Sequence, residues 1–404
     1  MRIGIASPIT IPALAPYLFA DSLERASQIA GMSAPSVDAL VGGLLARGHD
    51  IVVFTLDVTI REPLCLYGPH LKVCIGKYTK NGHLRALTFF LREIMQLRKF
   101  ILSEKPDVLH AHWSYEFAIA SFSSNIPTCV TFRDYAPVIF KFMPNFYRFM
   151  RLLMNWYVVR HSEKYHAIAN SQYMSELLLR HWHIQSDIIP NPISRDFIRP
   201  ANELPLYSAR NKRIVSICHG WSKRKNINAL LSAFSIVKKQ VPEAELVLIG
   251  EAFEEESDSV KQFCRLNPEQ VRDVTWKGHV PHNQLACEIG KSALLVHPSL
   301  EESFGNTLLE GMAQGIPVIG GIESGAVPYV LNNGEAGCLC DVTNPNRIAE
   351  AIVNILNDGE LWLKYSRAGY HHVVETFDLI KIISSTEQVY SNAIRDCIQS
   401  KKAP

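Results

Sequence analysis

Two glutamates separated by seven residues, Glu302 and Glu310, mark the part of the chain best suited to chemistry. The surrounding sequence predicts a strand that ends at His297, a loop, and a helix that begins near Gly305 and Asn306. Backbone N–H groups at a helix start have no partner within the helix and attract phosphate oxygens. Gly305 would let a ligand approach the backbone closely. One carboxylate could therefore face a sugar and the other a ribose, with a diphosphate between them.

A second group of residues could neutralise that diphosphate. Residues 219–226 follow a predicted strand, open a helix and contain Lys223, Arg224 and Lys225. Cations at a helix N-terminus oppose the macrodipole, so a solvated helix start explains them poorly. Positive charge here would stabilise the diphosphate as its bond to the sugar breaks.

These segments closely resemble the retaining family 4 glycosyltransferases of the GT-B fold, also called glycosyltransferase group 1. Glu302 and Glu310 match the Glu-x7-Glu motif of that family. The resemblance implies that Glu302 binds hydroxyls of the donor sugar and that Glu310 holds the nucleotide ribose. It also implies that the intervening amides contact sugar and diphosphate, namely those of Ser303, Phe304, Gly305 and Asn306.

The resemblance extends over nearly the whole chain. Residues 40–55, 105–113, 169–171, 189–193 and 325–328 resemble segments of the family in order. Residues 276–280 resemble the loop that meets the nucleotide base, with Val280 as the expected contact.

The cation loop departs from the family at one position. Lys225 matches the lysine that the family places just before the helix. The arginine expected early in the loop is missing, and Gly220 and Trp221 stand there instead. Arg224 or Lys223 would have to replace it.

The acceptor side departs as well. Many relatives carry a histidine after the strand at residues 129–131, where this chain has Arg133 and Asp134. Arg133 could bind a phosphate or a sugar hydroxyl but cannot act as a general base, since its pKa is expected to stay above about 12. Asp134 could position the acceptor hydroxyl. His112 could face the site only if its strand has already ended, and His110 suits a structural role equally well.

The Gly-Gly pair that many relatives carry after the first strand is also absent. A long proline-rich segment leads instead to Gly31, which could form the equivalent turn near the donor diphosphate.

Short apolar runs alternate with stretches of helical period, which predicts an α/β protein. We expect the GT-B architecture, with two Rossmann-like parallel-sheet domains facing across a cleft, because ligands bind at the carboxyl ends of such strands. The expected parts are an acceptor-side domain at 1–190, a linker at 191–211, a nucleotide-sugar domain at 212–374, and a C-terminal helix at 375–404 that could pack back on the first domain.

Composition narrows the function classes. The 404 residues are 47% hydrophobic and 20% charged with a net charge of +2, which suits a globular enzyme and argues against nucleic-acid binding. Nine scattered cysteines without Cys-x-x-Cys disfavour zinc and disulfides and favour a reducing cytoplasm. Prolines early in the chain disfavour a signal peptide, and no Asp-x-Asp or histidine cluster predicts a metal site.

Two segments could meet a membrane. Residues 83–101 place Leu84, Leu87, Leu91, Ile94 and Ile101 at helical spacing beside basic residues. Residues 142–160 combine apolar and aromatic side chains with Arg148, Arg151 and Arg160 and contain no acid. Both suit either peripheral contact with anionic lipid or ordinary packing helices with snorkelling cations.

The sequence therefore predicts a metal-independent, retaining hexosyltransferase without a cofactor. Its donor would be a UDP- or GDP-sugar and its acceptor a glycan or lipid-linked saccharide, in polysaccharide or glycolipid biosynthesis. The alternatives are a GT-B-fold sugar-nucleotide epimerase or hydrolase and a non-catalytic glycan-binding relative. A nicotinamide dehydrogenase is disfavoured because Ala6, Ser7 and Pro8 replace a glycine-rich turn after the first strand.

Overall fold

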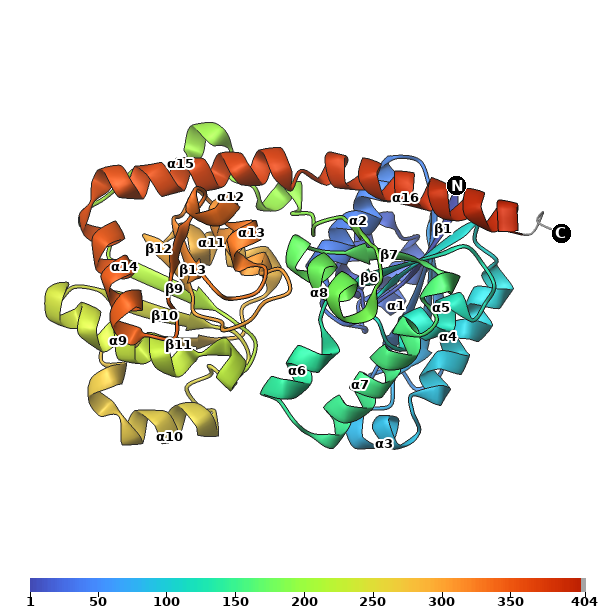
Figure 1. The fold of residues 1–404 in the computed structure, drawn as a ribbon, viewed down its shortest axis with the longest axis horizontal. Coiled ribbons are helices and arrows are strands. Elements are labelled where there is room, and N and C mark those ends of the chain that lie inside the picture. Colours follow the sequence, from blue (N-terminus) through green and yellow to red (C-terminus); the bar gives the residue numbers. More distant parts are fainter. Residues whose placement is uncertain (401–404) are drawn as a thin grey trace. The chain divides into compact units, whose positions relative to one another are not determined.

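The computed structural model describes residues 1–400 and divides them into two compact units. The N-terminal unit comprises Met1–Pro192 together with the chain from Leu379 onward, and the C-terminal unit comprises Ile193–Asp378 (Figure 1). Each unit is built on a largely parallel sheet covered by helices. This arrangement confirms the predicted α/β class with two parallel-sheet domains.

The sheet of the N-terminal unit has the order β3-β4-β2-β1-β5-β6-β7-β8. Every pairing is parallel except that of β3 with β4, a hairpin that the sequence analysis did not predict. The strands are β1 Arg2–Ala6, β2 Asp50–Asp57, β3 Leu64–Tyr67, β4 Leu71–Lys77, β5 Val108–His112, β6 Thr128–Phe132, β7 His166–Ala169 and β8 Asp187–Ile188. The helices are α1 Ala20–Ala26, α2 Pro35–Ala46, α3 Gly82–Leu87, α4 Leu91–Glu104, α5 Glu116–Phe122, α6 Ala136–Phe142, α7 Phe146–Val159, α8 Gln172–Trp182 and α16 Leu379–Ser400.

The last helix, α16, packs against α2, β5 and β6 of the N-terminal unit. Gly43 permits this contact, because a Cβ there would lie 2.1 Å from Cδ1 of Ile383. Tyr390 is fully buried, and its hydroxyl lies 2.8 Å from Nδ1 of His110. His110 also lies 2.7 Å from Oγ1 of Thr131, so this histidine is a satisfied structural residue.

The sheet of the C-terminal unit has the order β11-β10-β9-β12-β13-β14, all parallel. Its strands are β9 Arg213–Ile217, β10 Glu245–Ile249, β11 Val274–Gly278, β12 Leu294–His297, β13 Val318–Gly321 and β14 Cys338–Cys340. Its helices are α9 Ile227–Gln240, α10 Asp258–Leu266, α11 His282–Gly290, α12 Asn306–Ala313, α13 Val327–Val330, α14 Pro345–Asn357 and α15 Gly359–Thr376.

Residues 193–211 belong to the C-terminal unit and pack against its helices. The Arg199 amide donates to the carbonyl of Ala313, and the Tyr370 hydroxyl donates to the carbonyl of Arg199. The Gln314 side chain donates to the carbonyl of Phe197 at 2.5 Å. This segment is therefore tied to the end of α12 and to α15.

The helical spacing of residues 83–101 predicts one continuous helix, and this prediction is wrong, because the structure has two, α3 and α4. The chain breaks between α3 and α4, where Phe89 and Phe90 have φ angles of 52° and 57°. Phe90 is fully buried at this break, so its packing sets the break against local helix propensity. The predicted apolar stripe divides accordingly: Ile94 and Ile101 are buried, whereas Leu84, Leu87 and Leu91 are exposed.

Of the two expectations for residues 142–160, lipid contact or ordinary helix packing, Arg151 on α7 follows the second. Its guanidinium donates to the Glu116 carboxylate at 2.6 Å, and both side chains are buried. It also contacts the rings of Phe90 and Tyr115. The bare sequence could not reveal this contact because the partners lie on different elements. Among residues 1–400, no helix combines the length and apolarity that a membrane span requires.

Candidate active site

The loop that carries Glu302 is shaped by Gly305. Gly305 lies just before α12 with a φ of 99°, a conformation that glycine adopts readily and most residues avoid. The helix starts at Asn306, as predicted. Phe304 is buried and packs edge-on against Phe377 at 5.7 Å, so only its backbone is placed to meet a ligand.

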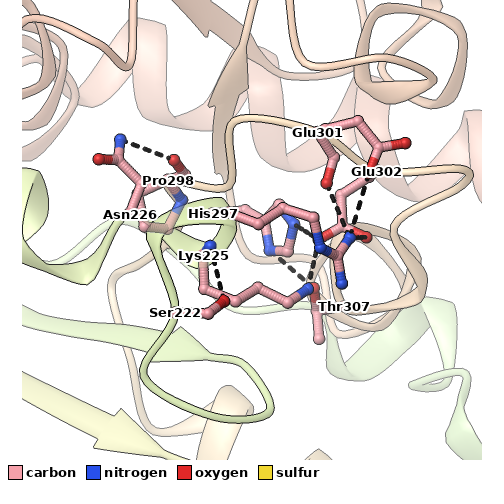
Figure 2. Close-up of polar contacts among 9 residues, drawn as sticks. Ser222, Lys225, Asn226, His297, Pro298, Glu301, Glu302 and Thr307 are labelled. Atoms are coloured by element: carbon pink, nitrogen blue, oxygen red, sulfur yellow. Dashed lines mark hydrogen bonds and ion pairs between the residues drawn. The ribbon is translucent and has the colours of Figure 1, made fainter. Parts of the chain in front are cut away.

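Glu302 is buried among donors from two segments, the loop after β9 and the end of β12 (Figure 2). Its Oε1 lies 2.5 Å from Nζ of Lys225 and accepts from Nε2 of His297 at 3.1 Å. Its Oε2 lies 3.7 Å from Nη1 of Arg224. Nδ1 of His297 lies 3.0 Å from Oγ1 of Thr307, which orients the imidazole toward Glu302.

These donors decide the charge state of the carboxylate. Burial of Glu302 opposes its ionisation, because the charged form is stabilised by water. Lys225, His297 and Arg224 together outweigh that cost, so the pKa of Glu302 lies well below its usual range. The group is therefore ionised over the whole neutral range.

The cation loop and the glutamate loop are joined by backbone and side-chain bonds. The amide of Leu300 donates to the carbonyl of Arg224 at 2.8 Å, and Nη1 of Arg224 donates to the carbonyl of Glu301 at 3.0 Å. Asn226 adopts the left-handed conformation and donates to the carbonyls of Pro298 and Val342. These bonds fix Lys225 beside Glu302.

The structure thus brings together three residues predicted for the site, Glu302, Lys225 and Arg224. Beside them lie three that the sequence did not indicate, Glu301, His297 and Asn226. Arg224 contacts the carboxylate of Glu301 at 3.3 Å, closer than its approach to Glu302. Only their positions in the sequence could have indicated that His297 and Asn226 belong to the site. His297 ends a predicted strand and Asn226 begins a predicted helix, each next to a loop.

The position of the missing arginine has a structural explanation. Trp221 stacks on Trp276 with ring centroids 5.5 Å apart and also contacts Phe253 and Phe263. Gly220 beside it has a φ of 76°, and its amide donates to the carbonyl of Glu251. An aromatic cluster therefore occupies this place, and Lys225 and Arg224 supply the positive charge. Val280 follows β11 and is partly exposed.

Glu310 lies within α12 and is buried, with a residual exposure of 7%. Its Oε1 accepts from Nε2 of His282 at 3.1 Å. Within the described part of the chain, its Oε2 has no hydrogen-bond partner. A buried carboxylate oxygen without a donor is costly unless a ligand supplies one.

In the N-terminal unit, Arg133 and His112 form a direct pair. The guanidinium of Arg133 donates to Nδ1 of His112 at 2.9 and 3.1 Å, to Oγ of Ser36 at 3.0 Å and to Oδ1 of Asn191 at 2.6 Å. Burial lowers the pKa of Arg133 to about 10, which corrects the expectation of a value above 12. Arg133 is still charged at pH 7, so it remains unsuited to general-base catalysis.

His112 is the last residue of β5, so its strand has not ended before it, which was the condition expected for His112 to face the site. His110 and His112 therefore share one face of the strand, with ring centroids 4.0 Å apart. Burial, His110 and Arg133 hold the pKa of His112 well below its usual range, so the ring is neutral. Because a guanidinium only donates, Nδ1 must accept and the proton must lie on Nε2. Among residues 1–400, that Nε2 has no hydrogen-bond partner.

Asp134 and Gly31 are engaged within the N-terminal unit. Asp134 accepts from the Tyr115 hydroxyl at 3.0 Å. The Gly31 amide donates to Asp57 at 3.1 Å, so it is not available to a phosphate. A Cβ at Gly31 would lie 2.3 Å from the carbonyl oxygen of Ile9, and φ is 74°, so the turn itself requires glycine.

The described residues contain no group of three His, Cys, Asp or Glu side chains arranged to hold a metal ion. Near the start of α12, the C-terminal unit places the carboxylates of Glu301 and Glu302 beside the cations Arg224 and Lys225. Such a set can bind hydroxyl groups and a diphosphate.

Two family models match the chain in succession. The family described as Glycosyltransferase Family 4 matches residues 34–197, and the family described as Glycosyl transferases group 1 matches residues 205–372.

Relatives and solved structures agree with these matches. The chain is 26% identical over 356 residues to a phosphatidyl-myo-inositol mannosyltransferase of Mycobacterium leprae, covering 85% of this chain and 88% of that protein. It is 28% identical over 192 residues to an N-acetyl-alpha-D-glucosaminyl L-malate synthase of Bacillus anthracis, covering 46% of this chain and 48%, about half, of that protein.

Two solved structures share the fold over nearly all of this chain. The sucrose-phosphate synthase of Thermosynechococcus elongatus has a TM-score of 0.79 and 20% identity, covering 98% of this chain and 100% of that one. HepE of Anabaena in complex with UDP and glucose has a TM-score of 0.68 and 17% identity, covering 97% and 100%.

The low pKa of Glu302 predicts a pH dependence of stability. A carboxyl whose pKa is lower in the folded than in the unfolded chain stabilises the fold above its ordinary value, 4.5 here, and that contribution disappears as the pH falls through the folded value. We expect wild type to lose more free energy of unfolding between about pH 6 and pH 3 than Glu302→Gln does. Urea unfolding across this range measures it. The exposed Glu350→Gln should follow wild type, and parallel curves for wild type and Glu302→Gln would contradict the assignment.

Proposed function

Because this chain belongs to the family 4 glycosyltransferases of the GT-B fold, as its Glu-x7-Glu segment predicted, we propose that it is a retaining hexosyltransferase. It would move a sugar from a UDP- or GDP-sugar to a glycan or a lipid-linked saccharide, in polysaccharide or glycolipid biosynthesis. The observation that carries the proposal is the pairing of buried Glu302 with Lys225 and Arg224 beside the start of α12.

In this proposal Glu302 binds hydroxyls of the donor sugar, while Lys225 can turn to the diphosphate. Nε2 of His297 contacts the same carboxylate, so Glu302 keeps a donor when Lys225 turns away. Arg224 adds charge from the same loop, and the backbone of Ser303, Phe304, Gly305 and Asn306 meets sugar and diphosphate oxygens. This arrangement stabilises the leaving diphosphate electrostatically.

Glu310 holds the ribose through its unpartnered Oε2, which needs a hydroxyl donor. Val280 and Gly220 lie on the loops that follow β11 and β9, where we place the nucleotide. The solved structure of Anabaena HepE contains UDP and glucose, which favours a nucleotide-sugar donor for the present chain.

We place the acceptor at the N-terminal unit, beside His112, Arg133 and Asp134. Neutral His112 offers an N–H on Nε2, and Arg133 fixes its orientation. In retaining transfer the bond from the anomeric carbon to the phosphate oxygen breaks, the acceptor oxygen bonds to that carbon on the same face, and the departing phosphate takes the acceptor proton. This course requires no protein base, which fits a site where Nδ1 of His112 already accepts from Arg133 and Nε2 carries the proton.

The two glutamates should respond differently to replacement. Glu310→Gln should raise the donor KM and weaken binding of the nucleoside diphosphate by about 1–3 kcal/mol, because a ribose contact is equally present in ground and transition states. Glu302→Gln should lower kcat and leave nucleotide affinity nearly intact, because it contacts the sugar as charge develops there. Calorimetry and steady-state kinetics measure both effects.

An exposed pair provides matched controls, since Glu335→Gln and Glu350→Gln should behave as wild type. If Glu302→Gln loses nucleotide affinity and Glu310→Gln does not, the two roles are reversed. Wild-type kinetics in both variants would exclude this donor site.

Transfer should proceed without a divalent metal ion, because Lys225, Arg224 and the amides at the start of α12 meet the charge of the diphosphate. We expect full activity in excess EDTA and no gain from added Mg²⁺ or Mn²⁺. Loss of activity in EDTA that either ion restores would contradict this mechanism.

We also propose peripheral contact with an anionic membrane, on the cytoplasmic face. Helix α3 packs against α7, and exposed apolar side chains lie on α3, α4 and α7. We call these the interfacial surface: Leu84, Leu87, Leu91, Met95, Phe146, Phe149 and Trp156. Arg92 is exposed on α4, and Arg160 is exposed at the end of α7. Both can meet lipid phosphates. The Mycobacterium leprae relative is named a phosphatidyl-myo-inositol mannosyltransferase, and this name favours a lipid acceptor for the present chain.

Binding to vesicles should depend on this surface and on salt. We expect co-sedimentation with vesicles that contain anionic lipid, weakened as ionic strength rises. The variant Leu87→Ser with Phe149→Ser should bind less, while Leu266→Ser, an exposed leucine of the C-terminal unit, should bind as wild type. Equal partitioning onto neutral and anionic vesicles at every salt concentration would exclude the proposal.

A further inference from the structure

The carboxylate of Glu310 is held on one side only. His282 donates from Nε2 to Oε1 at 3.1 Å, and the buried Oε2 has no partner among the described residues. A carboxylate accepts at both oxygens, so the imidazole fixes which oxygen faces away from the protein donor. Without this bond, the buried carboxylate could rotate or lose part of its stabilisation as an anion.

His282 is itself held in place. It is the first residue of α11, two residues after Val280, and its side chain is 39% exposed. Its ring packs against the ring of Phe197, with centroids 5.1 Å apart and planes inclined by 32°. The ring of Phe197 thus restricts rotation of the His282 side chain.

The support of His282 leads back to the helix that carries Glu310. The carbonyl of Phe197 accepts from the side chain of Gln314, which caps the end of α12. Gln314 in turn accepts from Nε of Arg199 at 3.3 Å. Phe197, His282 and Glu310 are therefore linked to one helix, and the loop after β11 is tied to the same carboxylate.

We propose that His282 is a positioning residue for the donor nucleotide, which orients Glu310 so that Oε2 receives the ribose hydroxyls. The inference rests on the proposed role of Glu310 in the preceding section. It assigns to His282 a contribution to nucleotide affinity that acts through the carboxylate, with no part in the chemical step. It also links the segment that carries Val280 to the ribose contact, so that the two are positioned together.

The experiment compares His282→Ala, His282→Gln, Glu310→Gln and the double variant His282→Ala with Glu310→Gln. Calorimetry with UDP and with GDP gives Kd for whichever nucleotide the wild type binds, and kinetics give the donor KM and kcat. His282→Ala should raise Kd and KM roughly 2- to 10-fold, the usual effect of one hydrogen bond, with kcat close to wild type. His282→Gln should restore most of the affinity, since its amide nitrogen can replace Nε2 as a donor.

The double variant distinguishes action through Glu310 from direct contact with the nucleotide. If His282 acts through Glu310, removing it from Glu310→Gln should change Kd by less than about 2-fold, because the two effects are not additive. His371→Ala, an exposed histidine of the same unit, serves as a matched control and should bind as wild type. Thermal unfolding of each variant confirms that the fold is retained, and His282→Gln is informative even where His282→Ala is unstable.

Each contrary outcome has a separate meaning. Wild-type affinity in His282→Ala beside a loss in Glu310→Gln overturns the positioning role and leaves the proposed function intact. Additive losses in the double variant overturn action through Glu310. Wild-type affinity in Glu310→Gln overturns the ribose contact of the proposed function and this inference with it.

Discussion

A buried carboxylate that must remain ionised is the constraint on which the C-terminal unit depends. Burying such a charge without partners costs several kcal/mol, so Glu302 requires donors that reach it from other segments. They come from the end of β12 through His297 and from the loop after β9 through Lys225. The left-handed Asn226 and the bond from Leu300 to Arg224 then follow as the means of holding those two loops together.

The N-terminal unit solves the opposite problem, a buried cation. Arg133 donates to uncharged acceptors on three segments, at Ser36, His112 and Asn191. This pattern obliges Nδ1 of His112 to accept, so the tautomer of the histidine follows from the charge of its neighbour. The ends of β5 and β6, the start of α2 and the chain near residue 191 are fixed by one guanidinium.

The sequence allowed prediction of what neighbouring residues determine. Glu302, Gly305 and the start of α12 belong to one continuous segment, and the strands alternate with helices throughout, so motif and periodicity were sufficient. Long-range contacts were beyond it. The burial of Arg151 against Glu116 and the bond from His282 to Glu310 join residues on separate elements, and the periodicity of one element carries no information about its partner. The prediction of a continuous helix through Phe90 was wrong for a related reason, because the packing of this buried ring overrode local helix propensity.

The positive and negative side chains of the candidate site nearly balance one another. Glu301 and Glu302 offset Lys225 and Arg224, so the cluster is close to neutral before any diphosphate arrives. In the proposed function a bound diphosphate adds negative charge, which Lys225 can meet by leaving Glu302. Lys225 can do so because His297 still donates to Glu302. Under that proposal Lys225 exchanges one anionic partner for another, and Glu302 is not left without a donor. Under the proposed function, this exchange of partners lets the cation loop meet the charge that develops on the leaving group as its bond to the sugar breaks.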